Sequence, residues 1–377
     1  MNIEKFEIEQ WMNDYEDRAQ YNIAESCADI LSLEELLEIV GEDKAAYMEG
    51  LLSMKLTYGS IPGGEELKEG ICRLYKDIRK EEVLSTHGGI GGNNSVLFSL
   101  LEEGDEVVAL YPTYQQLYSV PESIGAKVKY LKTKKEDNFL PRVEELKKLI
   151  TNKTKLICIN NPNNPTGALI SEATLREIAS EAGRVGAYIL CDEAYRGLSH
   201  DGSYAYSIVD IYEKGISTGS MSKVFSLPGL RIGWIATKAK EVIDKLLERR
   251  DYDIISCSMI DEAIAALALK NADKLIKRNL TLVNRNIEVL DRWISREEHF
   301  SYIKPKASTV TLLFYDFPIS SKEFSLRLLE KTGVFLTPGS CFGVEGSLRI
   351  GYAASIEVLE KALELLSQFS KKLSRAA

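Results

Sequence analysis

The sequence predicts an α/β protein in which a mostly parallel, seven-stranded sheet carries helices on both faces and is followed by a smaller α+β domain. Three observations predict this fold. The chain has 377 residues, which exceeds the size of one ordinary hydrophobic core. Between residues 83 and 236, seven apolar runs alternate with helical patterns, as in parallel sheets whose strands are joined by crossover helices. Beyond residue 238 the pattern becomes helical and then mixes short strands with helices.

The first 80 residues are expected to be mainly helical. A polar helical stretch surrounds Trp11, and a second helix is expected to start at Ser32, where the sequence resembles a capping box. A glycine-rich segment over 56–64 precedes a helix predicted from residue 65 to about 78.

The alternating region contains the predicted sheet. Strands are predicted at 83–86, 107–111, 127–131, 156–160, 188–191, 216–218 and 232–236. Helices are predicted between the earlier strands, at 95–101, 114–124, 142–150 and 172–182. Because ligands bind at the carboxyl ends of the strands in such sheets, the residues that directly follow these runs are the candidates for chemistry.

The last third of the chain is expected to form a separate unit. Helices are predicted at 243–250 and 259–293, the second leading out of the large domain. Short strands (309–315, 334–336, 347–352) and helices (321–331, 356–373) follow. We therefore divide the chain into three parts: an N-terminal segment (1–40) that contributes to the small domain and the active site, a large ligand-binding domain (41–270) and a small α+β domain (271–377).

The composition argues against several classes of binding partner. Hydrophobic residues make up 45% and charged residues 27%, as in ordinary soluble globular proteins. The formal charge of −9 argues against nucleic acid or an anionic membrane as the main partner. No apolar run approaches the roughly 20 residues needed to cross a bilayer.

The cysteines and the N-terminus indicate a cytoplasmic protein. Six scattered cysteines form no CxxC pair or Cys/His cluster, so no metal site is expected and the pattern fits a reducing compartment. Cys158 and Cys191 lie in apolar runs and are expected to be buried. Residues 1–10 are acidic and amphipathic and do not resemble a signal peptide.

The segment 220–234 carries the strongest chemical pattern. Small hydroxyl residues precede Lys223, a Pro-Gly turn follows, and Arg231 stands before an apolar run. A lysine in a tight polar turn is expected to lose its proton more easily than a solvated one, and its amine can form a Schiff base with an aldehyde. The arginine can hold a phosphate bidentately. Taken alone, a lysine in a surface loop is the commoner explanation.

Two further stretches follow predicted strands. Residues 86–93 are rich in glycine, which lets backbone N–H groups approach an anion at a helix N-terminus, although most glycine-rich turns are only turns. Tyr114 follows the next strand and can stack on a flat ring, or can equally pack on the core.

Asparagine and carboxylate side chains follow the next two strands. Two prolines hold the turn around Asn164 rigidly, which makes its side chain a fixed hydrogen-bonding group. Asp192 ends a strand three positions before Tyr195. If a ring-shaped ligand bound here, the acid could pair with a protonated nitrogen of that ring while the tyrosine hydroxyl bonded an oxygen on it. An ion-paired aspartate at a strand end is the equal alternative.

Together the five stretches supply what pyridoxal phosphate requires. They offer an amine for its aldehyde, an acid for the ring nitrogen, donors for the phenolic oxygen, an aromatic ring to stack and a phosphate cradle. In the order and spacing of these motifs, from about residue 20 to the C-terminus, the sequence resembles the class I/II aminotransferases, which are pyridoxal-phosphate enzymes of fold type I.

The resemblance implies a role for individual residues. Lys223 would carry the Schiff base and the proton, with Asp192 and Tyr195 as further catalytic groups. The residues implied to bind the cofactor are Tyr58, Gly89, Ile90, Tyr114, Asn164, Asp192, Tyr195, Ser220, Ser222, Lys223 and Arg231. Arg349 would bind the substrate carboxylate together with Asn164. Tyr58 would reach the phosphate in a neighbouring subunit, which implies a homodimer with shared active sites.

Two departures from the family pattern bear on the reaction. The phosphate-binding stretch is Gly-Gly-Ile-Gly-Gly, which predicts a more flexible loop than usual. The N-terminal segment is closer to a branch that includes capreomycidine synthase and arginine-oxidising enzymes, in which acidic residues meet a guanidinium group. Glu16 and Glu25 are the candidates for that role here, although exposed glutamates on a helix are the commoner explanation.

The expected function is therefore amino transfer between an L-amino acid and a 2-oxo acid. A pyridoxal-phosphate lyase, cyclase or oxidase acting on a basic amino acid such as arginine is the alternative. A non-enzymatic binding or regulatory descendant ranks last, because Lys223, Asp192, Tyr195 and Arg231 are all present.

Overall fold

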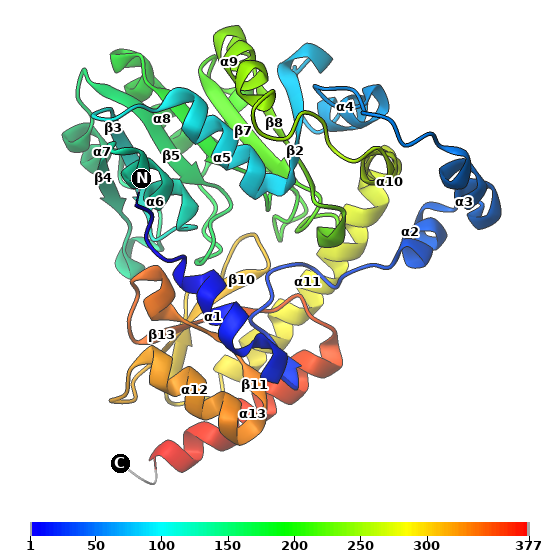
Figure 1. Ribbon diagram of the computed structural model, residues 1–377. Helices are drawn as coiled ribbons and strands as arrows, with labels where there is room; N and C mark the ends of the chain where they lie inside the picture. The colour runs from blue at the N-terminus through cyan, green and yellow to red at the C-terminus, as the bar shows by residue number, and fades with distance from the viewer. Residues whose placement is uncertain (1, 375–377) are drawn as a thin grey trace.

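The protein is built around two separate β-sheets, seen one above the other in the computed structural model, which describes residues 2–374 (Figure 1). The larger sheet has seven strands in the order β2-β8-β7-β6-β5-β3-β4. Only β8 runs antiparallel to its neighbours, so the predicted mostly parallel α/β sheet is confirmed. In chain order, the strands are β2 (Val83–His87), β3 (Glu106–Tyr111), β4 (Lys127–Lys132), β5 (Thr154–Asn160), β6 (Tyr188–Asp192), β7 (Gly215–Ser220) and β8 (Ile232–Thr237).

Alternate residues of each central strand pack on opposite faces of this sheet. In β3, Val107 and Ala109 join a core with α5 (Gly88–Leu100), α6 (Gln116–Ile124) and α9 (Lys240–Arg250). Val108 and Leu110 join the core on the other face, with α4 (Glu65–Cys72), α7 (Val143–Leu149), α8 (Glu172–Val185) and α10 (Met259–Lys270). Burial on both faces explains why the strands are continuous apolar runs.

The smaller sheet is antiparallel, in the order β12-β13-β10-β9. Its strands are β9 (Phe300–Tyr302), β10 (Val310–Tyr315), β12 (Thr337–Pro338) and β13 (Ser347–Gly351), and it packs with α11 (Ala272–Ile294), α12 (Ser321–Thr332) and α13 (Ile356–Ser374). The predicted strand 334–336 is instead β11 (Val334–Phe335), which pairs in parallel with β1 (Tyr21–Asn22) and so attaches the N-terminal segment here.

Two predicted helices are shorter than expected. The helix predicted over 259–293 is two helices, because Asn271 caps the end of α10 with its backbone N–H on Ala268 O and its side chain on Leu267 O. The helix predicted from 65 to about 78 ends at Cys72, before a series of turns. The division at residues 40 and 270 stays a proposal, and the break at Asn271 supports its second boundary.

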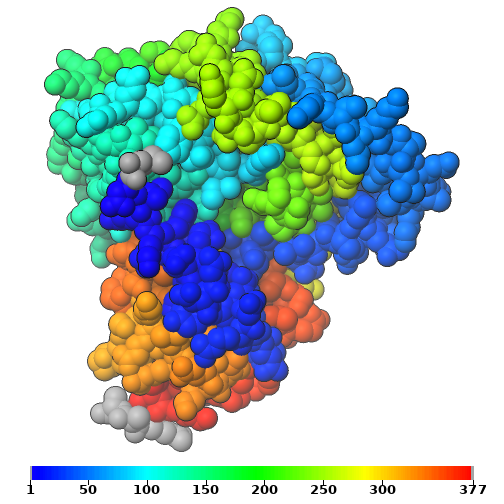
Figure 2. All heavy atoms as spheres, viewed as in Figure 1, coloured from blue at the N-terminus to red at the C-terminus, as the bar shows by residue number. Residues whose placement is uncertain are grey.

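The N-terminal segment joins the two parts across the front of the molecule (Figure 2). Helix α1 (Glu7–Tyr15) lies on the smaller part, where Trp11 donates to Leu336 O at 3.0 Å and stacks on Phe335. Its first residue is tied to the larger part, because the Glu7 N–H donates to Gln115 Oε1 at 2.9 Å. The capped start at Ser32 is confirmed in α2 (Leu33–Val40), and α3 (Lys44–Ser53) follows. No helix within residues 2–374 combines the length and apolarity that crossing a bilayer requires.

Candidate active site

A pocket of about 420 Å³ lies at the carboxyl ends of the large-sheet strands, between the two parts of the molecule and the N-terminal segment. It brings together side chains that are separated by more than 300 residues in sequence. Its lining includes the predicted residues Glu16, Glu25, Gly89, Ile90, Tyr114, Asn164, Asp192, Tyr195, Ser220, Ser222, Lys223, Arg231 and Arg349. Tyr58 is not among them: its side chain is 80% exposed on the segment between α3 and α4.

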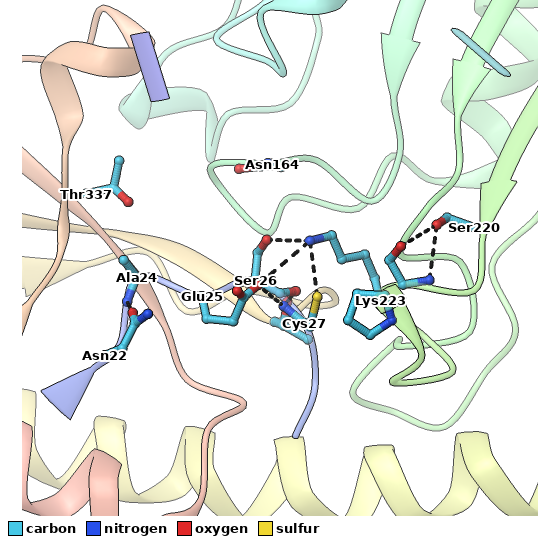
Figure 3. Close-up of polar contacts among 12 residues, drawn as sticks. Asn22, Ala24, Glu25, Ser26, Cys27, Asn164, Ser220, Lys223 and Thr337 are labelled. Carbon is cyan, nitrogen blue, oxygen red and sulfur yellow. Dashed lines mark hydrogen bonds and ion pairs between the residues drawn. The ribbon is translucent and has the colours of Figure 1, made fainter. Parts of the chain in front are cut away.

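Lys223 points from the turn after β7 toward the N-terminal segment (Figure 3). Its Nζ lies 2.8 Å from Ser26 Oγ, 3.4 Å from Cys27 Sγ and 3.9 Å from Glu25 Oε1. Sequence analysis missed Ser26 and Cys27, because nothing in their local pattern relates them to a lysine almost 200 positions later.

The expectation that the turn itself would favour loss of the Lys223 proton is wrong for the surroundings seen here. Burial lowers the pKa of Lys223, but the neighbouring Cys27, Tyr195 and Glu25 outweigh burial and raise that pKa above the ordinary lysine value. The direction of this pKa shift is therefore set by the groups across the pocket and not by the turn. The same contact, together with the backbone N–H groups of Ser26 and Cys27, lowers the pKa of Glu25 although burial opposes this.

The lysine turn is supported from both sides. On one side, the Ser220 hydroxyl accepts from the Ser222 N–H and donates to the Ser222 hydroxyl at 2.9 Å (Figure 3). On the other, the buried Asn279 of α11 donates to Val224 O at 2.7 Å and to Ser226 Oγ at 2.9 Å. Asn279 thus ties the long helix between the two sheets to the turn that carries Lys223.

The glycine-rich stretch forms the first turns of α5 and not the predicted flexible loop. Strand β2 ends at His87 and the chain enters the helix at Gly88 with a φ of +70°, so no loop residues remain between them. A Cβ at Gly233 would lie 2.4 Å from Gly88 C, which explains why glycine allows β8 to pass this helix start. Arg231 Nη2 would lie 2.8 Å from a Cβ at Gly88, so its guanidinium adjoins the N-terminus of α5. Helix N–H groups, an arginine and serine hydroxyls are the groups that commonly bind phosphate in proteins.

Asp192 ends β6 and is almost completely buried. Burial raises the pKa of its carboxyl group, while hydrogen bonds from the Asn93 side chain and the Ala194 N–H oppose that rise. The Asn93 bond is 2.7 Å long. Asn93 was not predicted as a site residue. The one signal in the sequence is that a polar residue stands among the glycine and apolar residues that form the buried face of α5.

Two residues that line the pocket each carry a buried polar atom without a hydrogen-bond partner among the described residues. They are the Tyr195 hydroxyl and Nε of Arg349. The Arg349 guanidinium is otherwise held by Asn164 Oδ1 at 3.1 Å and Ala24 O at 2.7 Å. Because unpaired buried polar atoms are costly, a ligand oxygen is expected at each of these positions.

Three glutamate side chains line the pocket. Glu9 and Glu16 come from α1 and the turn after it, and Glu25 from the segment opposite Lys223. Burial and the nearby Glu25 raise the pKa of Glu16, which shows that the two carboxylates repel each other. The Tyr114 hydroxyl donates to Glu9 Oε1 at 3.2 Å, and its ring contacts Phe6.

These donors match the chemistry of pyridoxal phosphate group by group. A half-buried amine shares the pocket with a tyrosine hydroxyl that has no partner among the described residues, a buried carboxylate stands at a strand end, and an arginine adjoins a helix start. The family model described as aminotransferase class I and II matches residues 37–366. The chain belongs to this family. It is a pyridoxal-phosphate-dependent aminotransferase of fold type I.

Known proteins, two of them aminotransferases, resemble the chain over most of its length. A crystal structure of a PLP-dependent aminotransferase from Streptococcus suis superimposes with a TM-score of 0.96 at 41% identity, covering 99% of each chain. The aspartate aminotransferase of Pyrococcus abyssi is 30% identical, covering 96% of this chain and 98% of its own. The capreomycidine synthase of Streptomyces vinaceus is 27% identical, covering 82% of this chain and 80% of its own.

Proposed function

We propose that this aminotransferase uses Lys223 as its covalent attachment point and proton carrier, and that its amino donor is a basic L-amino acid. The observation that carries the proposal is the arrangement of one pocket. Lys223 and Arg349 line it together with Glu9, Glu16 and Glu25. A pocket that holds both basic and acidic side chains fits a substrate that carries both a carboxylate and a side-chain cation.

The residues that would hold the cofactor occupy separate parts of this pocket. Gly89 and Ile90 at the start of α5, with Ser220, Ser222 and Arg231, would bind the phosphate. Asp192 would pair with the ring nitrogen, Tyr114 would stack on the ring, and Asn164 with Tyr195 would bond the ring oxygen. Bound pyridoxal phosphate supplies an electron-withdrawing ring that stabilises negative charge at the substrate α-carbon.

The protein's own part in the reaction is to orient the substrate and to move one proton. The Arg349 guanidinium would bind the α-carboxylate bidentately, with the amino group directed toward Lys223. Once free and neutral, Lys223 Nζ would accept the α-proton as a general base and then return it as a general acid. Ser26 Oγ, 2.8 Å from Nζ, would hold the amine in position between these steps.

A second reaction remains the competing proposal. A lyase, cyclase or oxidase acting on a basic amino acid such as arginine would use the same attachment and the same proton transfer. The similarity to capreomycidine synthase and the glutamates that line the pocket both favour this alternative. The requirement for a 2-oxo acid distinguishes the two reactions.

The test is a panel of amino donors, each supplied with and without a 2-oxo acid. We expect arginine and lysine to react faster than aspartate or phenylalanine, and turnover to require the 2-oxo acid. The amino group should appear on the acceptor in equal amount to the keto acid formed. Sustained turnover or O₂ consumption without an acceptor would instead establish the alternative.

Removing charge from the pocket wall tests the donor class. Glu16→Gln and Glu25→Gln should each raise KM for a basic donor roughly tenfold relative to KM for an uncharged donor, because one contact between opposite charges is lost. The ratio is compared because Glu25 also contacts Lys223, so its replacement affects every donor. Asp17→Asn is the matched control, because Asp17 lies beside Glu16 but is exposed and outside the pocket lining. An unchanged donor profile in both variants would remove the basic-donor proposal.

We further propose a homodimer with shared sites. Tyr58 lies outside its own pocket, in the stretch 52–61, which also exposes Leu52, Leu56 and Ile61. A surface this apolar is typical of an interface between subunits. The predicted cytoplasmic location rests on the cysteine pattern and stays a prediction.

Mixed dimers would show whether the sites are shared. Lys223→Ala and Tyr58→Ala subunits should each be nearly inactive alone. After dissociation and reassociation, half of the dimers are mixed, and each has one site with both native residues, so activity should return to about a quarter of wild type. No recovery in mixed dimers, demonstrated to form by native mass spectrometry, would contradict shared sites.

A further inference from the structure

Asn93 occupies a central place in the pocket's supporting shell without lining the pocket itself. It lies on α5, one turn after the first glycines, and is completely buried. Its Nδ2 donates to Asp192 Oδ2 at 2.7 Å and to Gln116 Oε1 at 3.2 Å. Its Oδ1 accepts from the Thr218 hydroxyl at 2.6 Å. The carboxamide thus uses both of its hydrogens and one acceptor site.

A backbone carbonyl determines which atoms donate and which accept in this series of hydrogen bonds. Ile90 O can only accept, so Gln116 presents Nε2 to it at 2.8 Å and turns Oε1 toward Asn93. Asn93 must then present Nδ2 to Gln116, and the same NH₂ group faces Asp192. The Thr218 hydroxyl completes the arrangement by donating to the remaining oxygen.

We propose that Asn93, oriented by Thr218 and Gln116, is the positioning residue that holds Asp192 as a carboxylate aimed at the cofactor ring nitrogen. The inference rests on the proposed role of Asp192. Asp192 accepts from Asn93 at one oxygen and from the Ala194 N–H at the other, and both donors favour the charged form. Burial alone would favour the neutral acid, which cannot stabilise a protonated ring nitrogen by charge.

The network also connects the groups that would contact different parts of the cofactor. Ile90 belongs to the helix start that would bind the phosphate, Gln116 follows the stacking residue Tyr114 by two positions, and Thr218 precedes Ser220 on β7. Asn93 therefore connects the proposed phosphate site to the proposed ring-nitrogen site through hydrogen bonds. Replacing Asn93 should change both the protonation of the cofactor ring and the affinity for the cofactor.

The test is nitrogen NMR of enzyme loaded with cofactor that is isotopically labelled at the ring nitrogen, together with a cofactor dissociation constant for each variant. We expect a protonated ring nitrogen in wild type and in Thr218→Ser, which keeps the hydroxyl. Asn93→Leu and Thr218→Val should shift the signal toward the neutral form. In Asn93→Leu, cofactor binding should weaken roughly tenfold or more, because a hydrogen bond to a buried charge is lost. Asn94→Ala, the adjacent half-buried residue, should match wild type.

Asp192→Asn separates the two possible failures. If Asp192→Asn makes the ring nitrogen neutral while Asn93→Leu and Thr218→Val leave it protonated with wild-type affinity, the inference about Asn93 is overturned and the role of Asp192 stands. If Asp192→Asn also leaves it protonated, the proposed role of Asp192 itself is overturned. Thermal unfolding of each variant identifies any that is misfolded, and Thr218→Val, which preserves side-chain shape, then carries the test in place of Asn93→Leu.

Discussion

Replacing Lys223 with alanine is expected to reduce amino transfer by at least about a thousandfold, because the variant loses both the covalent attachment point and the general base. The pocket offers no substitute at the same place: its other lining side chains include no second lysine. The cofactor should still bind through the phosphate site, but without the absorbance of its lysine-linked form.

Two controls isolate the cause of this loss. Lys223→Arg keeps a cation opposite Glu25, 3.9 Å from Lys223 in the native chain, but cannot form the covalent link, so it should be as inactive as Lys223→Ala. Lys240→Ala removes an exposed lysine from α9 and should behave as wild type. Near-normal turnover in Lys223→Ala would contradict the proposed mechanism at its first step.

Replacing Arg349 with glutamine should have the next largest effect. Its guanidinium is buried and bonded to Asn164 and Ala24, and its Nε has no hydrogen-bond partner among the described residues. Loss of a buried charged partner for the substrate carboxylate costs about 2–5 kcal/mol, so kcat/KM should fall by roughly 30-fold or more. Arg349→Lys should restore only part of this, because an ammonium cannot bind a carboxylate bidentately.

The decisive comparison uses the decarboxylated analogue of the preferred donor. That amine lacks the group that Arg349 would bind, so wild type and Arg349→Gln should process it at similar, low rates. Arg327→Gln, on the exposed side of α12, is the control for a general loss of arginine charge. A variant that loses equal activity toward both compounds would show that Arg349 acts on the fold of the pocket and not on the carboxylate.

The strands of the large sheet can be predicted from the sequence because each is an apolar run, which can be recognised without knowing which strands it pairs with. Val107 to Leu110 are apolar because both faces of β3 are covered, and that burial is visible in the sequence as an uninterrupted run. The same logic locates Asp192, because a polar residue that directly follows such a run must lie at the carboxyl edge.

Contacts between distant segments could not be predicted in this way. Ser26 and Cys27 meet Lys223 only because β1 pairs with β11 and the following residues then pass between the two sheets, where the Thr309 hydroxyl donates to Ser26 O. The direction in which the Lys223 pKa is shifted follows from these neighbours, and so it was predicted wrongly from the turn alone. Asn93 was missed for the same reason, since its partners come from α6, β6 and β7.

The central claim is that the cofactor is attached at Lys223, in the pocket between the two sheets and the N-terminal segment. Borohydride reduction of the cofactor-loaded enzyme makes the attachment permanent, and peptide mass spectrometry then locates it. We predict a single modified lysine, Lys223. A cofactor found on any other lysine, or an enzyme that turns over with no lysine modified, would contradict the account.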